Sequence, residues 1–394
     1  MRFSLKAECW FYTFLWVMYY LQGVLYPSAS FFAKVALGLV LVMSLYRSIS
    51  FFSLGLSRYY KAAMWLVVMF FVYGFFHLFE SPAIMRSEFE SFPVTQYYYL
   101  KDSMCSLLPL FAYGFYCRRG IINDNNITKF IALFFFLAVI NFFSYSRMLL
   151  SVTALNVDSG FSLVNNMGYR FIPLMPLVYF MRKYRNLYLL TCYLFTVLCL
   201  KRGALIVGSI FVFVYMLNTI ILDRRRGSKH TKIVVLIVFF VAFVFLYDYI
   251  RQNEILFGRI NAMLEGDSSG REDYYVIAFN YLFKDLDVFR FLFGGGANTS
   301  IRIIGNYAHN DWLEIGMNNG LLGLSIYVSF LFAGLFTWKQ LKRKNQKDES
   351  FAFGMYILAF FLMSLFSMAV TEIGPVYSIG IGFCMYHPSK KQYT

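Results

Sequence analysis

Charged residues are scarce in this chain of 394 residues: only 14% are Asp, Glu, Lys or Arg, whereas 59% are hydrophobic and 21% are aromatic. A soluble domain is roughly 45–50% apolar, so this composition excludes an ordinary water-soluble globular protein. Such an excess of apolar residues predicts a polytopic integral membrane protein.

Paired cysteines are also missing. The six cysteines are scattered, without a Cys-x-x-Cys pair and without histidines at the spacing of a zinc site. We therefore predict core thiols, not disulfides or metal ligands, at Cys9, Cys105, Cys117, Cys192, Cys199 and Cys384. No metal and no cofactor is expected.

Internal repeats are absent as well. Two related six-span halves would place a long central loop after the sixth span, as in a major-facilitator carrier. The long loops of this chain instead lie near 80–102, 144–167 and 251–310. No small-residue cleavage site follows the first apolar run, which we therefore interpret as a signal anchor.

Apolar runs of about 20 residues, enough to cross a hydrocarbon core of about 30 Å as helices, recur along the chain. They predict an all-α transmembrane bundle of about twelve spans, near 9–26, 31–46, 62–79, 103–117, 127–143, 168–181, 187–200, 203–222, 232–250, 311–338, 351–370 and 373–386. The expected organisation is nine spans within 1–250, a long loop at 251–310, and three spans within 311–394 that leave the C-terminus in the cytoplasm.

The basic residues set the expected orientation, because short loops rich in Lys and Arg stay cytoplasmic. With Met1 inside, the cytoplasmic face receives the clusters at 47–61, 118–119, 182–185, 224–232, 339–347 and 390–391. The net charge of +15 is thus spread along a membrane face rather than gathered on one soluble surface. We expect contact with anionic lipid and no nucleic-acid partner.

One basic pair stands against this pattern. Lys201-Arg202-Gly203 separates the seventh and eighth predicted spans, on the non-cytoplasmic side. A charge placed against the positive-inside bias usually has a partner or a function. The alternative is that both side chains only snorkel to the interface.

The long loop contains a segment that suggests a short helix. Arg271 precedes a stretch from 272 to 283 that we interpret as an interfacial amphipathic helix. Its apolar face is expected to consist of Tyr274, Ala278, Tyr281 and Leu282.

Two further loop motifs have competing interpretations. The glycine run at 293–298 is either a flexible turn or a nest of bare amides for an anion. Asp285-Leu286-Asp287 has the spacing by which nucleotide-sugar glycosyltransferases hold a divalent cation. No nucleotide sugar is expected on the outer face, so we do not predict a metal there.

The loop ends in the most informative motif, His309-Asn310-Asp311-Trp312-Leu313-Glu314. Asp311 and Glu314 have capping-box spacing, so one interpretation is that they only terminate the tenth span. In the other interpretation the positive end of that helix points at an outer-face cavity beside Arg202 and Arg271, where pyrophosphate would fit.

His309 itself can accept a proton from an attacking sugar hydroxyl, because histidine titrates near neutral pH. The glycines that follow it on the same helical face would let the span pack closely against a neighbour, which predicts a packing role for Gly316, Gly320 and Gly323.

Together these features resemble the O-antigen polymerase and O-antigen ligase superfamily. The resemblance rests on about twelve spans, a late long loop with Ser-Gly-Arg at 269–271, a Gly-x-Gly element at Gly294 and Gly296, and His-Asn-Asp-x-Leu-Glu at 309–314 followed by glycines. In specific residues it covers roughly 200–325. It implies a metal-independent, GT-C-like glycosyltransferase on the periplasmic face of a Gram-negative inner membrane, with a glycan on undecaprenyl pyrophosphate as donor.

The resemblance also implies roles for single residues. Arg202 matches the family's outer-face arginine, Arg271 its loop arginine, and His309 its loop-ending histidine. Arginine suits a pyrophosphate because its planar fork binds phosphate oxygens bidentately and stays charged. Further pyrophosphate-binding candidates are Lys201, Arg302 and Arg170.

For the base that deprotonates the acceptor, His309 is expected, with Glu314 or Asp311 as the alternative. In-line attack on the anomeric carbon would invert its configuration. Gly294, Gly296, Gly316, Gly320 and Gly323 are expected to serve loop and helix packing.

Polymerase and ligase differ only in the acceptor, which is another lipid-linked repeat unit or the lipid A-core. The 309–314 motif favours the polymerase. The implied partners are lipid-linked repeat units, membrane lipid, a chain-length regulator and a flippase. From another class, the chain itself could be a lipid-linked oligosaccharide flippase, but charged residues within spans and related halves, which a flippase should show, are not found.

Overall fold

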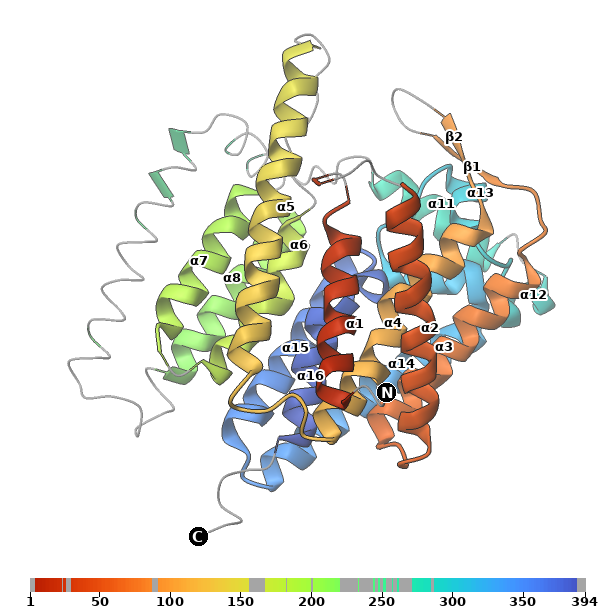
Figure 1. Ribbon diagram of the computed structural model, residues 1–394. Coiled ribbons are helices and arrows are strands. Elements are labelled where there is room, and N and C mark those ends of the chain that lie inside the picture. Colours follow the sequence, from red (N-terminus) through yellow and green to blue (C-terminus); the bar gives the residue numbers. More distant parts are fainter. Residues whose placement is uncertain are drawn as a thin grey trace.

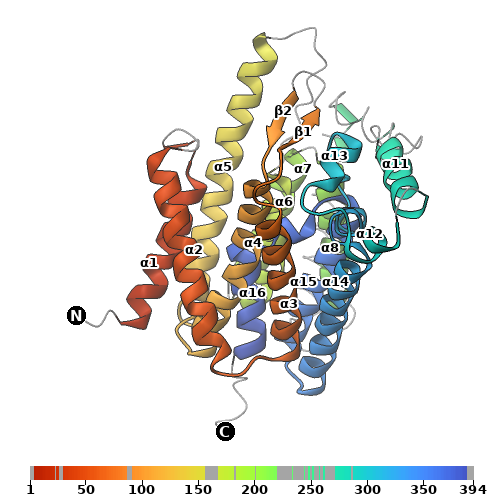
Figure 2. The same ribbon diagram turned by 90° about the vertical axis from the view of Figure 1, so that its right-hand side faces the viewer.

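The computed structural model describes residues 4–22, 24–25, 30–86, 91–155, 167–181, 183–199, 201–219, 271–284 and 287–387, with a few isolated positions between 233 and 261. This part of the chain is a bundle of helices with one small sheet (Figures 1 and 2). The predicted ninth span and most of 251–270 lie outside the described residues.

The long helices run between the two ends of the bundle. They are α1 (Leu5–Tyr20), α2 (Phe31–Phe52), α3 (Arg58–Phe76), α4 (Gln96–Arg118), α5 (Ile127–Leu155), α7 (Arg185–Leu198), α8 (Arg202–Leu217), α14 (Asp311–Arg343), α15 (Lys347–Phe366) and α16 (Gly374–Tyr386). Within the described residues, five of them, α2, α3, α5, α14 and α15, are long and apolar enough to cross a membrane. The prediction of a helical membrane protein is confirmed at this level.

The long helices run in both directions along the bundle, so the chain passes repeatedly between two distinct ends (Figure 1). We call the end where both chain termini lie the terminal end; it includes Glu8, Arg47, Arg118 and His387. The opposite, hairpin end carries the antiparallel strands β1 (Ala83–Arg86) and β2 (Ser91–Val94) with the short helices α11 (Arg271–Phe283) and α13 (Thr299–Ile304).

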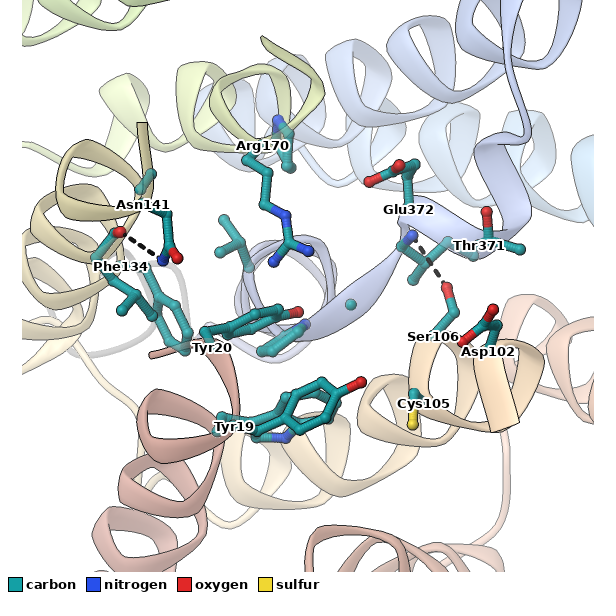
Figure 3. A pocket seen from close by; sticks show the side chains of 18 residues that line it. Tyr19, Tyr20, Asp102, Cys105, Ser106, Phe134, Asn141, Arg170, Thr371 and Glu372 are labelled. Atoms are coloured by element: carbon teal, nitrogen blue, oxygen red, sulfur yellow. Dashed lines mark hydrogen bonds between the residues drawn. The ribbon is translucent and has the colours of Figure 1, made fainter. Parts of the chain in front are cut away.

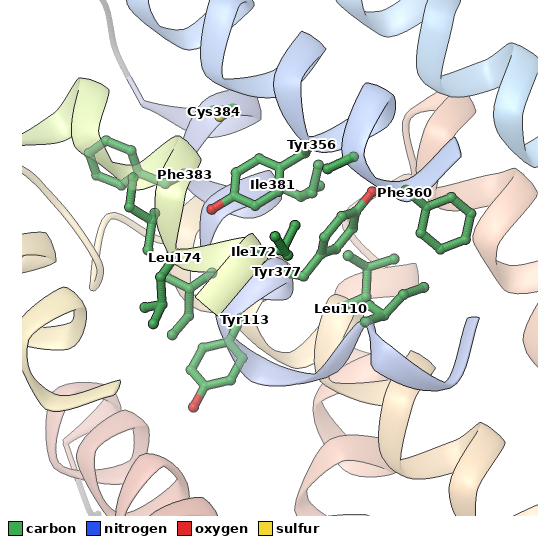
Figure 4. Packing of buried hydrophobic residues seen from close by; sticks show 14 of the residues in the cluster. Leu110, Tyr113, Ile172, Leu174, Tyr356, Phe360, Tyr377, Ile381, Phe383 and Cys384 are labelled. Carbon is green, nitrogen blue, oxygen red and sulfur yellow. The ribbon is translucent and has the colours of Figure 1, made fainter. Parts of the chain in front are cut away.

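The core lies where α16 packs against α4 and α15 (Figure 4). Tyr356 of α15 and Tyr377 of α16 meet there edge to face, with ring centroids 5.1 Å apart. The hydroxyl of Tyr356 donates to the carbonyl of Pro173, 2.9 Å away, so this buried tyrosine is satisfied without water. All six cysteines are free thiols, and five of them are buried, as predicted.

The sixth predicted span differs from an α-helix. A short helix, α6 (Gly168–Phe171), leads into η1 (Ile172–Phe180), a 3-10 helix. Pro173 and Pro176 provide the physical reason, because proline has no amide hydrogen for the α-helical ladder. The segment is nevertheless buried, so hydropathy located it correctly but did not determine its backbone.

The loop near 80–102 is also more ordered than predicted. Its first part forms the hairpin, in which Ala83 pairs with Val94 and Arg86 with Ser91. The amide of Arg86 donates to the carbonyl of Gly305, 2.7 Å away. The hairpin is therefore joined to the segment that leads into His309.

The helix α14 is interrupted at Gly320, whose φ of 63° and ψ of −160° are not helical. Chain from the preceding loop fills the break: the amides of Gly295 and Gly296 donate to the carbonyls of Met317 and Asn318 at 2.9 and 3.0 Å. An interrupted helix inside a membrane protein is tolerated when other protein groups satisfy its backbone, as they do here.

We call this contact the glycine seam, formed by Gly294, Gly295, Gly296 and Gly320. A Cβ on Gly320 would lie 2.4 Å from the nitrogen of Gly294, and a Cβ on Gly294 would lie 2.4 Å from the carbonyl oxygen of Asn318. The seam is a rigid backbone contact, so the two amides that were candidates for an anion nest are already used.

Candidate functional site

Three cationic or titratable groups converge at the hairpin end from segments far apart in the sequence. Lys201 is the N-cap residue of α8, Arg271 is the first residue of α11, and His309 lies just before α14. Both Arg271 and Lys201 act electrostatically on His309. The structure therefore brings together three of the residues predicted from sequence.

His309 is held in a left-handed backbone conformation, with a φ of 52°. This region is uncommon for a residue with a side chain, and such residues are often found where a site constrains the chain. The ring is half-buried, and none of the described residues hydrogen-bonds to it. Its nitrogens are thus available to a ligand.

The pKa of His309 is lowered to about 4, first by burial and then by the positive charges of Arg271 and Lys201. The ring is consequently neutral near pH 7 and can accept a proton. An anion bound between the two cations would offset their effect and make the ring a stronger base.

Tyr169 of α6 lies among these groups. The ammonium of Lys201 is 5.9 Å from the centre of its ring, and Arg271 acts electrostatically on its hydroxyl. Gly203 makes this approach possible, because a Cβ there would lie 2.2 Å from the Tyr169 hydroxyl. The third residue of the Lys201-Arg202-Gly203 motif is therefore a packing requirement.

Arg271 is anchored by a backbone carbonyl. Its Nη1 donates to the carbonyl of Phe366, the last residue of α15, at 3.1 Å. Among the described residues, no carboxylate lies within ion-pair distance of the guanidinium. A positive charge held in this way remains available to an anionic ligand.

The other cationic candidates occupy different positions. Arg202 is the first residue of α8, next to Lys201. Arg170 of α6 places its guanidinium 4.3 Å from the centre of the Tyr20 ring. Arg302 of α13 forms an ion pair with Glu80 at 2.5 Å, close to the hairpin, and is already matched by a negative charge.

Asp311 and Glu314 are buried and hydrogen-bonded within the protein. Oδ2 of Asp311 accepts from the Tyr327 hydroxyl at 2.8 Å and from the amide of Val370 at 3.2 Å. Glu314 accepts from the amide of Ala308 and, at 3.4 Å, from Nδ2 of Asn318. Both carboxylates tie the start of α14 to neighbouring chain.

The N-cap residue of α14 is Asn310. Oδ1 of Asn310 accepts from the amides of Trp312 and Leu313 at 2.9 and 3.2 Å. Asp311 is already the first helical residue, so the N-cap lies one position earlier than expected and Asp311 and Glu314 do not form a capping box. Two amides of this helix end are thereby unavailable to an anion.

The predicted packing glycines lie in close contacts. Gly294 and Gly320 meet in the glycine seam, and a Cβ on Gly296 would lie 2.2 Å from the ring of His77. Gly316 packs beside Leu282 of α11, and Gly323 lies near Met69 of α3.

Asp287, part of the possible metal-binding motif, caps the short helix α12 (Val288–Phe293). Its Oδ1 accepts from the amide of Arg290 at 2.9 Å. Asp285 and Leu286 lie outside the described residues. The described half of this motif thus has a local structural role.

The predicted helix over 272–283 is present as α11, which buries Ala278 and Tyr281 of the predicted face. Its outer face is apolar as well, with Val276, Phe279 and Phe283 each more than half exposed. A helix that is apolar on both faces is expected where one side packs on protein and the other contacts lipid.

An apolar groove of about 540 Å³ runs beside α11. Asn310, the residue that follows His309, is one of its lining residues. Its walls come from α11, α14 and α15 and consist of Tyr275, Phe279, Trp312, Leu313, Phe361 and Leu365. Arg271 stands at the start of one of these helices, so an apolar surface and a positive charge meet here.

Sequence reasoning missed two residues at this end, Tyr169 and Glu372. Glu372 belongs to η3 (Ala369–Glu372), between the last two long helices, and Arg170 and Lys201 both act on it electrostatically. Burial raises the pKa of its carboxyl. The same rule that singled out Lys201, a charge in a short connection of an apolar chain, would have found it.

Taken together, the fold and site define a helical membrane protein with a cation and histidine site at the hairpin end, beside an apolar groove. Neither a protein-family model nor a curated protein sequence matches this chain.

Proposed function

We propose that this protein is an O-antigen polymerase, a metal-independent inverting glycosyltransferase that joins undecaprenyl-pyrophosphate-linked repeat units. We further propose about twelve spans in a GT-C-like arrangement, in a Gram-negative inner membrane with the hairpin end facing the periplasm. The observation that carries the proposal is the convergence of Arg271, Lys201 and His309 next to an apolar groove.

Each part of this arrangement suits one part of a lipid-linked donor. Arg271 and Lys201, assisted by Arg202, would bind the pyrophosphate, whose negative charge grows as the glycosidic bond breaks. The groove between α11 and α14 would take the first isoprenoid units, since its lining is apolar. Water and a nucleotide are not required at any step.

In the reaction, the acceptor hydroxyl oxygen forms a bond to the anomeric carbon of the donor sugar. The bond from that carbon to the pyrophosphate oxygen breaks, and undecaprenyl pyrophosphate leaves with the bonding electrons. His309 takes the hydroxyl proton. Because attack and departure occur on opposite faces, the anomeric configuration inverts and no covalent intermediate forms.

The electrostatics of His309 link the two substrates. Without a donor, Arg271 and Lys201 hold the pKa of His309 low. A bound pyrophosphate would offset both charges and raise the pKa of the ring toward the working pH, where a general base is most effective. The base would therefore become competent only after the donor has bound.

The test is a transfer assay with purified protein in lipid nanodiscs and its lipid-linked repeat unit. We expect His309→Gln and Arg271→Gln each to lower kcat/KM by roughly 100- to 1000-fold. Arg290→Gln is the matched control, because Arg290 is largely exposed on α12 and is paired with Asp287. Full activity in both site variants would refute the assignment.

A gel of surface polysaccharide from cells carrying the variants separates polymerase from ligase. Loss of a polymerase leaves core carrying one repeat unit, whereas loss of a ligase leaves bare core. Bare core in the His309→Gln strain would redirect the proposal to the ligase.

A further inference from the structure

A second cavity lies at the hairpin end, apart from the apolar groove, and none of the roles above uses it. It has a volume of about 320 Å³ and lies between α1, α4, α5, α6 and η3 (Figure 3). Its polar and aromatic lining includes Tyr19, Tyr20, Asp102, Asn141, Arg170 and Glu372.

Two charged groups in this cavity have no hydrogen-bonding partner among the described residues. Arg170 reaches in from α6 over the Tyr20 ring, and Glu372 lies across from it on η3 (Figure 3). Within the described residues, none accepts a hydrogen bond from the Arg170 guanidinium, and none donates one to the Glu372 carboxylate. Half-buried charges in this condition indicate a site prepared for a polar ligand.

The lining selects the chemistry of that ligand. A carboxylate accepts hydrogen bonds from hydroxyl groups, a guanidinium donates to ring and hydroxyl oxygens, and tyrosine rings present flat apolar surfaces. Opposite charges within one cavity disfavour a strongly anionic occupant such as pyrophosphate, because Glu372 would repel it. A neutral ligand with many hydroxyls matches all three features.

The cavity is also electrostatically connected to the site around His309. Lys201 acts electrostatically on both Glu372 and His309, so both groups lie within electrostatic range of the same lysine. A ligand held against Glu372 would therefore bind close to the lysine that also influences His309.

We propose that this cavity binds a sugar unit of the acceptor glycan, with Glu372 and Arg170 as its hydrogen-bonding groups and Tyr19 and Tyr20 as its aromatic wall. The identity of the glycan as an acceptor rests on the proposed function, whereas sugar binding in the cavity does not. The role of Glu372 here is recognition, and His309 remains the base.

Cys105 provides a direct probe, because it lines the cavity and is the one thiol that is not fully buried. The full-length protein in nanodiscs is treated with methyl methanethiosulfonate, and modification of Cys105 is followed by mass spectrometry. Free hexoses, 6-deoxyhexoses and N-acetylhexosamines are added in turn, and inorganic pyrophosphate in a separate arm. The five buried cysteines serve as internal controls.

We expect at least one of the sugars to slow modification of Cys105, and pyrophosphate not to. Glu372→Gln and Arg170→Gln should each weaken that sugar's affinity by roughly 10- to 100-fold, since each loses a charged hydrogen bond. Asp273→Asn, on an exposed position of α11, is the control that should leave it unchanged. Thermal unfolding of each variant verifies that it is folded.

Three results would overturn the proposal: no sugar protects Cys105, pyrophosphate protects it instead, or a sugar protects it equally in all variants. Failure of the polymerase proposal looks different, because it appears as absent glycan transfer in the nanodisc assay. If a sugar protects Cys105 but no glycan is transferred, the cavity assignment stands and the polymerase proposal fails. If glycan is transferred but no sugar protects Cys105, only the cavity assignment fails.

Discussion

The two ends of the bundle differ in how several of their positive charges are held. At the terminal end, the Arg47 guanidinium forms an ion pair with Glu8, and His387 lies between the carboxylates of Asp124 and Glu349 at 2.5 and 3.0 Å. Partners from other segments neutralise these two groups, whereas Arg118 at the same end donates to the carbonyls of Gly55 and Leu54.

At the hairpin end, Arg271 is bound to a carbonyl and Arg170 rests on an aromatic ring. No carboxylate among the described residues lies within ion-pair distance of either guanidinium. Arg302, paired with Glu80, is a hairpin-end residue that follows the terminal-end pattern. The comparison separates charges that hold the fold from charges that can receive an anion.

The largest effect is expected at the glycine seam, on which the hairpin end depends. Gly320→Ala would place a Cβ 2.4 Å from the nitrogen of Gly294, at a φ of 63°. Backbone atoms cannot yield, so we expect a loss of roughly 4 kcal/mol or more in unfolding free energy, or no folded protein. Thermal unfolding and size-exclusion chromatography in detergent measure this.

Gly38→Ala is the control for that change, because it lies within α2 and a Cβ there meets nothing within 4 Å. This variant should be as stable as the parent or slightly more so, since alanine favours a helix. Equal stability of the two variants would show that the seam is not a tight contact.

The second-largest loss of stability is expected from breaking the ion pair between Arg47 and Glu8 at the terminal end. Arg47→Met leaves Glu8 largely buried without its partner, with only the Tyr116 hydroxyl still donating to it. Breaking such a pair costs about 3 kcal/mol, seen as a lower unfolding temperature. Lys6→Met, at an exposed position of α1, should cost far less. If both variants unfold at the parent's temperature, the terminal-end charges are not structural.

His387 should make stability depend on pH. Hydrogen bonds that its imidazole donates to the carboxylates of Glu349 and Asp124 raise the pKa of His387. The sign follows from linkage: the charged pair stabilises the fold fully below the unfolded pKa of about 6.5, and that stability is lost as pH rises through the raised folded pKa. We expect a decrease on the order of 1–2 kcal/mol.

Thermal unfolding across that pH range, compared with His387→Gln, isolates this contribution. The variant should lack the decrease, because glutamine does not titrate. A parent protein whose stability rises with pH over the same interval would contradict the assignment.

The smallest expected effect is a shift in the acid limb of the pH dependence of kcat/KM, which His309 at the hairpin end controls. A histidine base fails when it is protonated, and burial with Arg271 and Lys201 lowers the pKa of His309 to about 4. The free enzyme should therefore keep kcat/KM well below pH 6.5. Arg271→Gln removes one cause of the low pKa, so the acid limb of its residual activity should move to higher pH.

Arg290→Gln should leave that limb in place, since Arg290 does not act on His309. An unchanged acid limb in Arg271→Gln would show that the arginine does not influence the base.

Hydropathy alone located much of this structure. The predicted spans at 31–46, 127–143 and 351–370 coincide with α2, α5 and α15, because a helix that contacts lipid must be apolar over its length. The helix at 272–283 was also predicted, from the periodicity of its apolar residues. These features depend on residues close together in the chain.

The break in α14 and the hairpin were not predicted, for a different reason. Gly320 leaves the helix because Gly295 and Gly296 supply replacement hydrogen bonds from a separate segment. In the same way, β1 is anchored through Gly305, and Asn310 rather than Asp311 caps α14. Local spacing cannot reveal a partner that lies outside the local sequence.

The amino-acid sequence by itself determined that this is a helical membrane protein, and it marked Lys201, Arg271 and His309 as unusual for their positions. Only the tertiary structure decided that these three lie together, that Arg302 is paired elsewhere, and that Arg170 and Glu372 share a cavity. The physical reason is range: hydrophobic partition acts on each helix separately, whereas electrostatic pairing depends on distances that exist only after the helices have packed.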